Sequence, residues 1–389
     1  MRVAIVHDWL ITLGGSELVL AELLRLYPDA HVFTLLDYFS PENREFVGVR
    51  RVSTSFLQRV PGIQRTYRRW LPLYPAAVRS LDVSGYDLVL SNSHAVAKSV
   101  TVANGQPHLC YCLSLMRYAW DLREQYLRET RLDRGVTGLV AGAILDGLRR
   151  WDRANAERVT AFATLSHYIA DRIRRAYNRS ATVVYPPVDV EYFTPPPSPS
   201  ARGDFYVTAS RLVPYKRIDL IARAFRLLPD RRLVIVGDGP EAAKIRAAAG
   251  PNVELVGHTD RATLRALLRD ARAFIFAAEE DFGIAPVEAQ ACGTPVIAFG
   301  RGGVTETVRA AASPVVDGAA IDDLTGVFFD EQSEGAIADA VRRFETLAPS
   351  ISRQACRRNA ERFSAANFRE GMRRFVDSEL VRHRRRQHV

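Results

Sequence analysis

Short apolar runs of strand length recur along the whole chain, and each is followed by a stretch long enough for a helix. The runs are continuous rather than alternating, which is typical of strands covered on both faces, and strand–helix alternation predicts right-handed βαβ units with a parallel sheet. Helices are expected between them, as over residues 16–26 and 218–228. The pattern occurs twice, with predicted strands at 3–6, 31–35, 87–90, 109–112, 161–165 and 182–185, then at 205–209, 233–236, 253–256, 273–277 and 295–299.

A segment rich in proline and serine, residues 194–203, separates the two copies and predicts a linker, because it cannot pack as helix or sheet. We therefore predict an N-terminal domain over residues 1–193 and a C-terminal domain over 204–363. A C-terminal helix over 364–381 is expected to pack back on the N-terminal domain, followed by a loose basic tail, 382–389. Ligands of open α/β sheets bind beyond the carboxyl ends of the strands, so a cleft between the facing domains is the expected site.

The charge balance narrows the classes of partner. The chain has 53 basic and 44 acidic residues, and lysine occurs only at Lys98, Lys216 and Lys244. Such a surplus suits anionic substrates, acidic membranes or nucleic acid. Nucleic acid is not expected, because no zinc-finger, RNP or homeodomain-like pattern is present. The four cysteines form no CxxC pair, the first residues do not resemble a secretory signal, and no apolar run could span a bilayer, so a cytoplasmic protein with free thiols is predicted.

Two motifs could bind phosphate. Gly14-Gly15-Ser16-Glu17 opens the first predicted helix, where glycines and a helix N-terminus favour an anion; a tight turn with a serine cap is the alternative. Arg211 and Lys216 follow the first strand of the second half and can converge on one diphosphate, with arginine as a planar fork and lysine as a point charge. A solvated loop remains the alternative for that pair.

Three further motifs lie at predicted strand ends of the second half. Gly237-Asp-Gly-Pro indicates a tight turn near a ligand, without the glycine spacing of a dinucleotide fingerprint. Glu280 and Glu288 have seven residues between them; Pro286 at the first helical position would place Glu288 in the first turn of a helix. The two carboxylates can accept hydrogen bonds from pairs of hydroxyls, or they can be a solvated loop residue and a helix-dipole partner. Gly302-Gly303 is a second pair of glycines directly before a predicted helix, as at Gly14-Gly15.

Taken in order, these motifs resemble the GT-B retaining glycosyltransferases of family 4. The likeness covers nearly the whole chain and extends to His7-Asp8-Trp9-Leu10, Met116-Arg-Tyr-Ala-Trp-Asp121 and Tyr185-Pro-Pro-Val-Asp189. These details look most like mannosyltransferase-type members that build bacterial O-antigen and exopolysaccharide. The implied fold is α/β, with two Rossmann-like domains facing each other across a cleft.

The resemblance also implies roles for individual residues. Arg211 and Lys216 would hold and stabilise the leaving diphosphate, Glu280 the donor-sugar hydroxyls and Glu288 the ribose. The implied donor-binding residues are Gly14, Gly15, Gly237, Val256, Gly257, Phe282, Gly283, Ile284, Glu288, Gly302, Gly303 and Val304. The residues implied for the acceptor or sugar region are Asp8, His94, Met116, Arg117 and Tyr118.

The sequence departs from the family at one position. Members usually carry a histidine shortly before Met-Arg-Tyr, where it touches the donor sugar, and Leu113 stands at that place here. His94 and His108 lie nearby in the sequence, and no spacing argument favours either. The donor-sugar contact that this histidine makes in the family is therefore not expected from Leu113.

The predicted function is transfer of a hexose, with retention, to a glycan or polyprenyl-linked acceptor in cell-surface polysaccharide synthesis. GDP-mannose is the preferred donor and a UDP-sugar the alternative. No Asp-x-Asp motif is present, so no metal or other cofactor is expected. Two other functions stay open: a sugar-nucleotide epimerase of the same fold, and a non-catalytic sugar-nucleotide-binding protein.

Residues 44–79 contain eight arginines and one acidic residue, Glu45. If the segment is largely helical, its apolar residues form one face with arginines on the other, the composition of a helix lying on an anionic bilayer. We therefore predict contact with the inner face of the cell membrane, with a core-facing helix as the alternative. The face consists of Phe56, Leu57, Val60, Ile63, Tyr67, Trp70 and Leu71.

Overall fold

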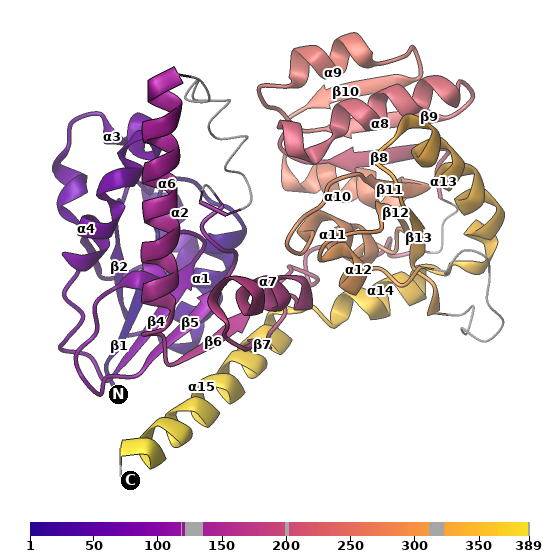
Figure 1. Cartoon of the computed structure of the whole chain (residues 1–389). Coiled ribbons are helices and arrows are strands. Elements are labelled where there is room, and N and C mark those ends of the chain that lie inside the picture. The colour runs from indigo at the N-terminus through magenta and orange to yellow at the C-terminus, as the bar shows by residue number, and fades with distance from the viewer. Residues whose placement is uncertain (118, 121–134, 199–201, 311–322, 388–389) are drawn as a thin grey trace. The chain divides into compact units, whose positions relative to one another are not determined.

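The computed structural model describes residues 1–117, 119–120, 135–198, 202–310 and 323–387. The chain divides into two compact units (Figure 1). Unit 1 comprises Met1–Pro187 and Phe368–Val389, and unit 2 comprises Val188–Asn367.

The chain passes between the units at Pro187 and Val188, before the predicted linker. The described parts of that segment, 194–198 and 202–203, belong to unit 2, where they are held by side-chain hydrogen bonds. Arg269 Nε donates to Thr194 O over 2.7 Å, and Arg202 Nη2 donates to Ile351 O over 3.0 Å. The prolines prevent regular structure, but carbonyl groups in such a segment can still accept hydrogen bonds. A linker at 194–203 is therefore wrong.

The sheet of unit 1 has seven parallel strands in the order β3-β2-β1-β4-β5-β6-β7. Its centre is β1, whose Ile5 pairs with Val32 of β2 on one side and with Leu90 of β4 on the other. The chain order reverses between β1 and β4, which makes their carboxyl ends the switch point where such sheets bind ligands. The strands are β1 Val3–His7, β2 His31–Thr34, β3 Val52–Thr54, β4 Leu88–Ser93, β5 His108–Cys112, β6 Ala161–Thr164 and β7 Ala181–Val183.

The sheet of unit 2 has six parallel strands in the order β10-β9-β8-β11-β12-β13, so its switch point lies between β8 and β11. The parallel α/β organisation predicted from the sequence is confirmed in both units. Two strands, β3 and β13, were not predicted. The strands of unit 2 are β8 Phe205–Ala209, β9 Arg232–Val236, β10 Val253–Gly257, β11 Ala273–Phe276, β12 Val296–Phe299 and β13 Gly326–Phe329.

Helices flank both sheets (Figure 1). Several begin at a side-chain cap: Ser166 Oγ accepts from Ile169 N, and Asp260 Oδ1 accepts from Thr263 N, which satisfies N–H groups that have no partner inside the helix. The helices of unit 1 include α1 Gly15–Leu26, α2 Pro41–Val47, α3 Ile63–Thr66, α4 Tyr74–Arg79, α6 Gly135–Ala156 and α7 His167–Tyr177. Those of unit 2 include α8 Ile218–Ala224, α9 Ala242–Ala248, α10 Arg261–Asp270, α11 Ile284–Ala291, α12 Val304–Thr307, α13 Glu334–Leu347 and α14 Arg353–Glu361.

The last helix, α15 Ala365–Gln387, runs from unit 2 into unit 1. Phe368 packs edge-on against Tyr111 of β5, with ring centroids 5.4 Å apart, and Arg369 pairs with the buried Glu22 of α1. The helix continues beyond residue 381, so the predicted loose tail is wrong as far as Gln387. Glu379, one turn before Arg382, supports the extension, because the two side chains pair at 2.6 Å.

The predicted amphipathic helix within residues 44–79 is not formed. Short pieces replace it: the 3₁₀ segments η1 Phe56–Arg59 and η2 Tyr67–Leu73, with α3 between them and α4 after them. Gly62 interrupts the segment with a φ of +70°. Most of the predicted apolar face lies in or against the core, because Leu57, Ile63 and Leu71 are at most 2% exposed.

Candidate functional sites

In unit 2, the switch point carries an ion pair. Lys216 lies on the 3₁₀ turn η4 Pro214–Lys216 after β8, and Glu280 follows β11. The Lys216 ammonium contacts Glu280 Oε1, and each side chain is 17% exposed. Two residues 64 positions apart in the sequence therefore meet where ligands bind in this class of sheet.

Arg211 is exposed on the loop between β8 and η4. The loop is held by the turn after β9, since Leu212 N donates to Asp238 O over 2.9 Å and Glu241 N donates to Leu212 O over 3.1 Å. A Cβ on Gly237 would lie 1.9 Å from Ser210 O, which is impossible without moving the backbone. The glycine thus allows close approach of two loops, one of which carries Arg211.

The Gly302-Gly303 pair positions Glu280 in a similar way. Glu280 and Gly302 form an isolated parallel bridge, and Gly303 N donates to Glu280 O over 2.7 Å. Added Cβ atoms would lie 2.5 Å from Glu280 O at Gly302 and 2.3 Å from Asp281 O at Gly303. Because neither contact is tolerable, these positions require glycine if the Glu280 loop is to keep its place.

Glu288 lies on α11, which begins at Ile284 after Gly283 with a φ of +91°. Pro286 is therefore the third helical residue rather than the first, and Glu288 lies in the second turn, because the left-handed glycine lets the helix start earlier than proline alone indicates. Burial raises the pKa of Glu288 to about 7; Arg261 opposes this shift and Asp189 adds to it. The carboxyl therefore changes charge near neutral pH.

The remaining residues predicted to bind the sugar-nucleotide donor differ in their exposure to solvent. Val256 is 38% exposed at the end of β10, next to Gly257, whose φ is +75°. Phe282 and Val304 are buried, the Phe282 ring packing 5.4 Å from that of Phe363. Val304 thus contributes to the core of unit 2 and supports the turn after Gly303. Ile284 is half-buried at the start of α11.

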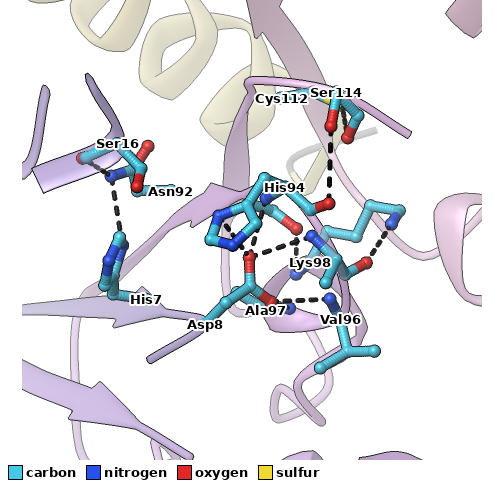
Figure 2. A network of polar contacts seen from close by, with 12 residues as sticks. His7, Asp8, Ser16, Asn92, His94, Val96, Ala97, Lys98, Cys112 and Ser114 are labelled. Carbon is cyan, nitrogen blue, oxygen red and sulfur yellow. Dashed lines mark hydrogen bonds and ion pairs between the residues drawn. The ribbon is translucent and has the colours of Figure 1, made fainter. Parts of the chain in front are cut away.

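In unit 1, the switch point is organised by Asp8, which follows β1 and is completely buried. Its two carboxylate oxygens accept hydrogen bonds from four consecutive backbone N–H groups, those of residues 94–97, over 2.6–3.0 Å (Figure 2). Burial works against the charge, but contact with His94 and these N–H groups outweighs it and lowers the pKa of Asp8. Asp8 therefore holds the loop after β4.

A second buried pair fixes the start of α1. His7 Nε2 lies 3.1 Å from Glu17 Oε1. On the other side of the ring, Asn92 Nδ2 lies 3.2 Å from His7 Nδ1 (Figure 2). Asn92 also donates to Ser16 O over 2.8 Å. A Cβ on Gly14 would lie 3.2 Å from Glu17 Oε2. Gly14, just before α1, thus adjoins a carboxylate that is already held inside unit 1, and Gly15 is the first residue of the helix.

His94 and His108, the two histidines that lie near Leu113 in the sequence, have different surroundings in the structure. His108 is buried on β5 and its Nε2 lies 2.8 Å from Ser91 Oγ, so it belongs to the core. The His94 side chain is 24% exposed and its ring stands perpendicular to that of Trp9 at 4.6 Å. Leu113 is 7% exposed. Its neighbour Ser114 donates to His94 O over 3.4 Å, so the loop with His94 contacts the segment that lacks the expected histidine.

One buried cluster was not recognised in the sequence. The Lys98 ammonium lies 2.7 Å from Asp152 Oδ1, and both side chains are fully buried. Asp152 Oδ2 also accepts from Trp120 Nε1 over 2.9 Å and from Tyr177 Oη over 2.5 Å. The rarity of lysine in this chain was the available signal, because it set Lys98 apart. The cluster joins the loop after β4 to α6 and α7.

Of the predicted acceptor residues, Met116 is fully buried in the core of unit 1 and Arg117 is half-buried. Met116 O accepts from Ala119 N and Trp120 N, which forms the turn that leads to the buried Asp152. Tyr118 lies outside the described residues.

Comparison with known proteins bears on both units. Residues 196–363 match the family described as Glycosyl transferases group 1. The chain is 32% identical over 232 residues to the GDP-mannose-dependent monoacylated alpha-(1-6)-phosphatidylinositol monomannoside mannosyltransferase of Corynebacterium glutamicum, covering 52% of this chain and 60% of that protein. It is 31% identical over 204 residues to the D-inositol 3-phosphate glycosyltransferase of Mycobacterium sp. strain JLS, covering 47% and 43%. The chain thus spans about half the length of these relatives.

Among solved structures, Anabaena HepE in complex with UDP has a TM-score of 0.68 at 18% identity, covering 97% of this chain and 100% of that chain. The lipopolysaccharide outer core galactosyltransferase WaaB has a TM-score of 0.61 at 15% identity, with coverages of 97% and 100%. These likenesses confirm the fold class, two Rossmann-like units of the GT-B type.

Proposed function

Because residues 196–363 match the glycosyl transferases group 1 family and the chain has the GT-B fold, we propose that this protein is a retaining hexosyltransferase that uses a sugar nucleotide. The observation that carries the proposal is the Lys216–Glu280 ion pair at the switch point of unit 2. A cation there can meet the charge of a leaving diphosphate, while the neighbouring carboxylate can bind sugar hydroxyls.

In this proposal, unit 2 binds the donor and unit 1 binds the acceptor. Arg211 and Lys216 hold the diphosphate, Glu280 the sugar and Glu288 the ribose, while the end of β10 at Val256 and Gly257 lies beside the base. The sugar is mannose from GDP-mannose, which the similarity to the GDP-mannose-dependent enzyme of C. glutamicum supports. A UDP-sugar is the alternative donor, since HepE was crystallised with UDP. The acceptor is a glycan or polyprenyl-linked glycan in cell-surface polysaccharide synthesis on the cytoplasmic side.

A thermal-shift screen of GDP-, UDP- and ADP-sugars tests the donor, because a ligand that binds only the folded state raises the Tm. We expect GDP-mannose to give the largest rise. Incubation of that donor with and without a mannoside acceptor then separates the function classes. Release of nucleoside diphosphate with formation of a new glycoside indicates a transferase, whereas a changed sugar nucleotide without acceptor indicates an epimerase.

The buried Leu113 favours one other function, a non-catalytic sugar-nucleotide-binding protein, since an aliphatic side chain cannot hydrogen-bond a sugar at that place. Such a protein would show the rise in Tm and no release of nucleoside diphosphate with any acceptor. The retained Lys216–Glu280 pair supports the transferase over this alternative.

Alanine substitutions of the two glutamates are expected to impair different steps, nucleotide binding for Glu288 and sugar transfer for Glu280. Glu288→Ala should weaken GDP-mannose binding by about 10- to 100-fold, the size of a lost hydrogen-bond pair to a charged group. Glu280→Ala should leave nucleotide binding near normal while it impairs sugar transfer. Because the pKa of Glu288 is about 7 and the ionised form accepts hydroxyl protons, affinity for GDP-mannose should rise as the pH rises through 7.

Titration calorimetry across this pH range measures the effect, and the sugar nucleotide itself does not interfere because its diphosphate is esterified at both ends. In Glu288→Gln the pH dependence should disappear, and in the exposed control Glu254→Gln it should persist. Equal loss of nucleotide affinity in Glu280→Ala and Glu288→Ala would show that the two roles are wrongly assigned.

We propose that the reaction needs no metal ion. In the described part of the chain, no three or more His, Cys, Asp or Glu side chains are grouped so that they could hold one. Arg211, Lys216 and helix N-termini would then meet the charge of the leaving group. Full activity in excess chelator is expected in a transfer assay. Loss of activity in chelator, restored by magnesium or manganese, would overturn the idea.

We further propose that the basic segment 44–79 contacts an anionic membrane. None of the helices that the structure describes is both long and apolar enough to cross a bilayer. Peripheral contact would use what the fold leaves exposed: Phe56 and Leu73 are 43% and 41% exposed, and Arg59, Arg65, Arg68 and Arg69 are exposed around them. Each such arginine near acidic lipid contributes about 1 kcal/mol.

Co-sedimentation with vesicles that contain anionic lipid should therefore show binding that falls with salt. The triple charge reversal Arg65→Glu, Arg68→Glu and Arg69→Glu should abolish binding and leave the Tm near that of the wild type. A matched triple reversal at Arg384, Arg385 and Arg386, exposed arginines at the end of α15, should have little effect. Failure of the wild type to bind such vesicles at low salt would exclude this partner and favour a soluble acceptor.

A further inference from the structure

His94 has an unusual combination of burial and access. Its Nδ1 is buried 3.2 Å from Asp8 Oδ2, a close contact without the alignment of a hydrogen bond. The exposed 24% of the side chain therefore lies on its other atoms, which include Nε2. Figure 2 shows the ring next to the Asp8 carboxylate. Asp8 directly follows β1 and His94 directly follows β4. The switch point of unit 1 thus presents an imidazole with one nitrogen buried next to a carboxylate.

The loop that carries His94 is fixed at both ends. Asp8 binds the N–H groups of residues 94–97, and Lys98 Nζ donates to Ala95 O over 2.8 Å while it pairs with Asp152. The ring itself packs edge-on against Trp9. The two buried carboxylates hold the loop and Trp9 packs against the ring, so the His94 side chain loses little further freedom when a ligand binds, which is how binding groups are preorganised.

The charges around the ring set its protonation. Burial lowers the pKa of His94; Asp8 and Glu17 oppose that shift, and His7 and Arg117 add to it. The ring is therefore neutral at neutral pH. An ionised carboxylate only accepts hydrogen bonds, so Asp8 favours the tautomer with its proton on Nδ1. Nε2 is then left as an acceptor that points away from Asp8.

We propose that His94 Nε2 accepts a hydrogen bond from a hydroxyl group of a glycoside bound by unit 1, with Asp8 as the positioning residue. The inference rests on the proposed function for the chemical class of the ligand, a sugar hydroxyl. The choice of His94 as the binding residue rests on the geometry of Asp8, His94 and Trp9. No comparable imidazole is available from His108, which is buried against Ser91.

Nitrogen NMR of the full-length protein labelled at histidine tests the proposal without catalysis. We expect the His94 signals to show a neutral ring with the proton on Nδ1 at pH 7. Titration with methyl α-mannopyranoside should shift the Nε2 signal and leave that of His167, on the surface of α7, unchanged. A proton on Nε2 in the free protein, or no shift at His94 up to the solubility limit of the probe, would overturn the proposal.

Two substitutions separate a binding role from a structural one. Asparagine can keep a donor near the position of Nδ1, next to Asp8, but lacks the outward nitrogen, whereas glutamine can reach the position of Nε2. We expect His94→Asn to lose the mannoside and His94→Gln to retain part of its affinity, with both Tm values near that of the wild type. The matched controls are His167→Asn and His167→Gln. Equal affinity in His94→Asn and the wild type would contradict the proposal.

The same variants give a kinetic reading once the donor screen has identified a substrate. His94→Asn should raise KM for the mannoside acceptor by about 10-fold or more, the size of one lost hydrogen bond, and leave donor affinity unchanged. A wild type that transfers no sugar from any donor would refute the proposed function. The NMR titration would still decide the role of His94 in that case.

Discussion

Lys216→Ala is expected to lower kcat by about 10²-fold or more, because the negative charge on the departing diphosphate is greatest in the transition state. The structure strengthens this expectation by placing the ammonium at the switch point of unit 2, next to Glu280. Steady-state kinetics with saturating donor measures the effect. Lys244→Ala is the matched control, since Lys244 also pairs with acids of unit 2 but lies on the surface of α9.

A rise in KM alone would show that Lys216 binds the donor without stabilising the transition state. The double variant Lys216→Ala with Glu280→Ala adds a further check. If the two residues act as a unit, their effects on kcat should be far from additive. Additive effects would mean that the ion pair is a feature of the free protein and is not used in the reaction.

Lys98→Met is expected to cause the largest loss of stability, about 3–5 kcal/mol, because it leaves the charge of Asp152 buried without its partner. Both side chains are fully buried, so water cannot compensate. Urea unfolding should show a lower midpoint with an unchanged slope. Lys244→Met, at an exposed lysine, should change the unfolding free energy by less than about 1 kcal/mol.

The double variant Lys98→Met with Asp152→Asn should recover much of the loss. The asparagine carbonyl carries no charge and can still accept from Trp120 Nε1 and Tyr177 Oη, which both bond to Asp152 in the wild type. If the double variant is as unstable as Lys98→Met, the loss comes from packing around the lysine stem and not from the unpaired charge.

Much of the fold could be predicted from local pattern. The strand at Phe205–Ala209 has the predicted bounds, because a buried parallel strand needs a continuous apolar run and this sequence has one between breaks. The edge strand Val52–Thr54 was missed because it is three half-buried residues in an arginine-rich segment. The strand Gly326–Phe329 was missed because it begins with a glycine. The fold requires a glycine at this position, since an added Cβ would lie 2.0 Å from Val296 O.

The α/β class, the two halves and the motifs at the strand ends follow from the amino-acid sequence, because these depend on periodicity and on residues close together in the chain. Which distant residues meet is known only from the folded chain. Lys98 and Asp152 are 54 positions apart, and His94 and His108 cannot be told apart until one lies in the core and the other at a strand end. The position at which the chain passes from one unit to the other is likewise known only from the tertiary structure. Proline content indicates where a chain is irregular, whereas hydrogen bonds such as that from Arg269 to Thr194 decide to which unit it belongs.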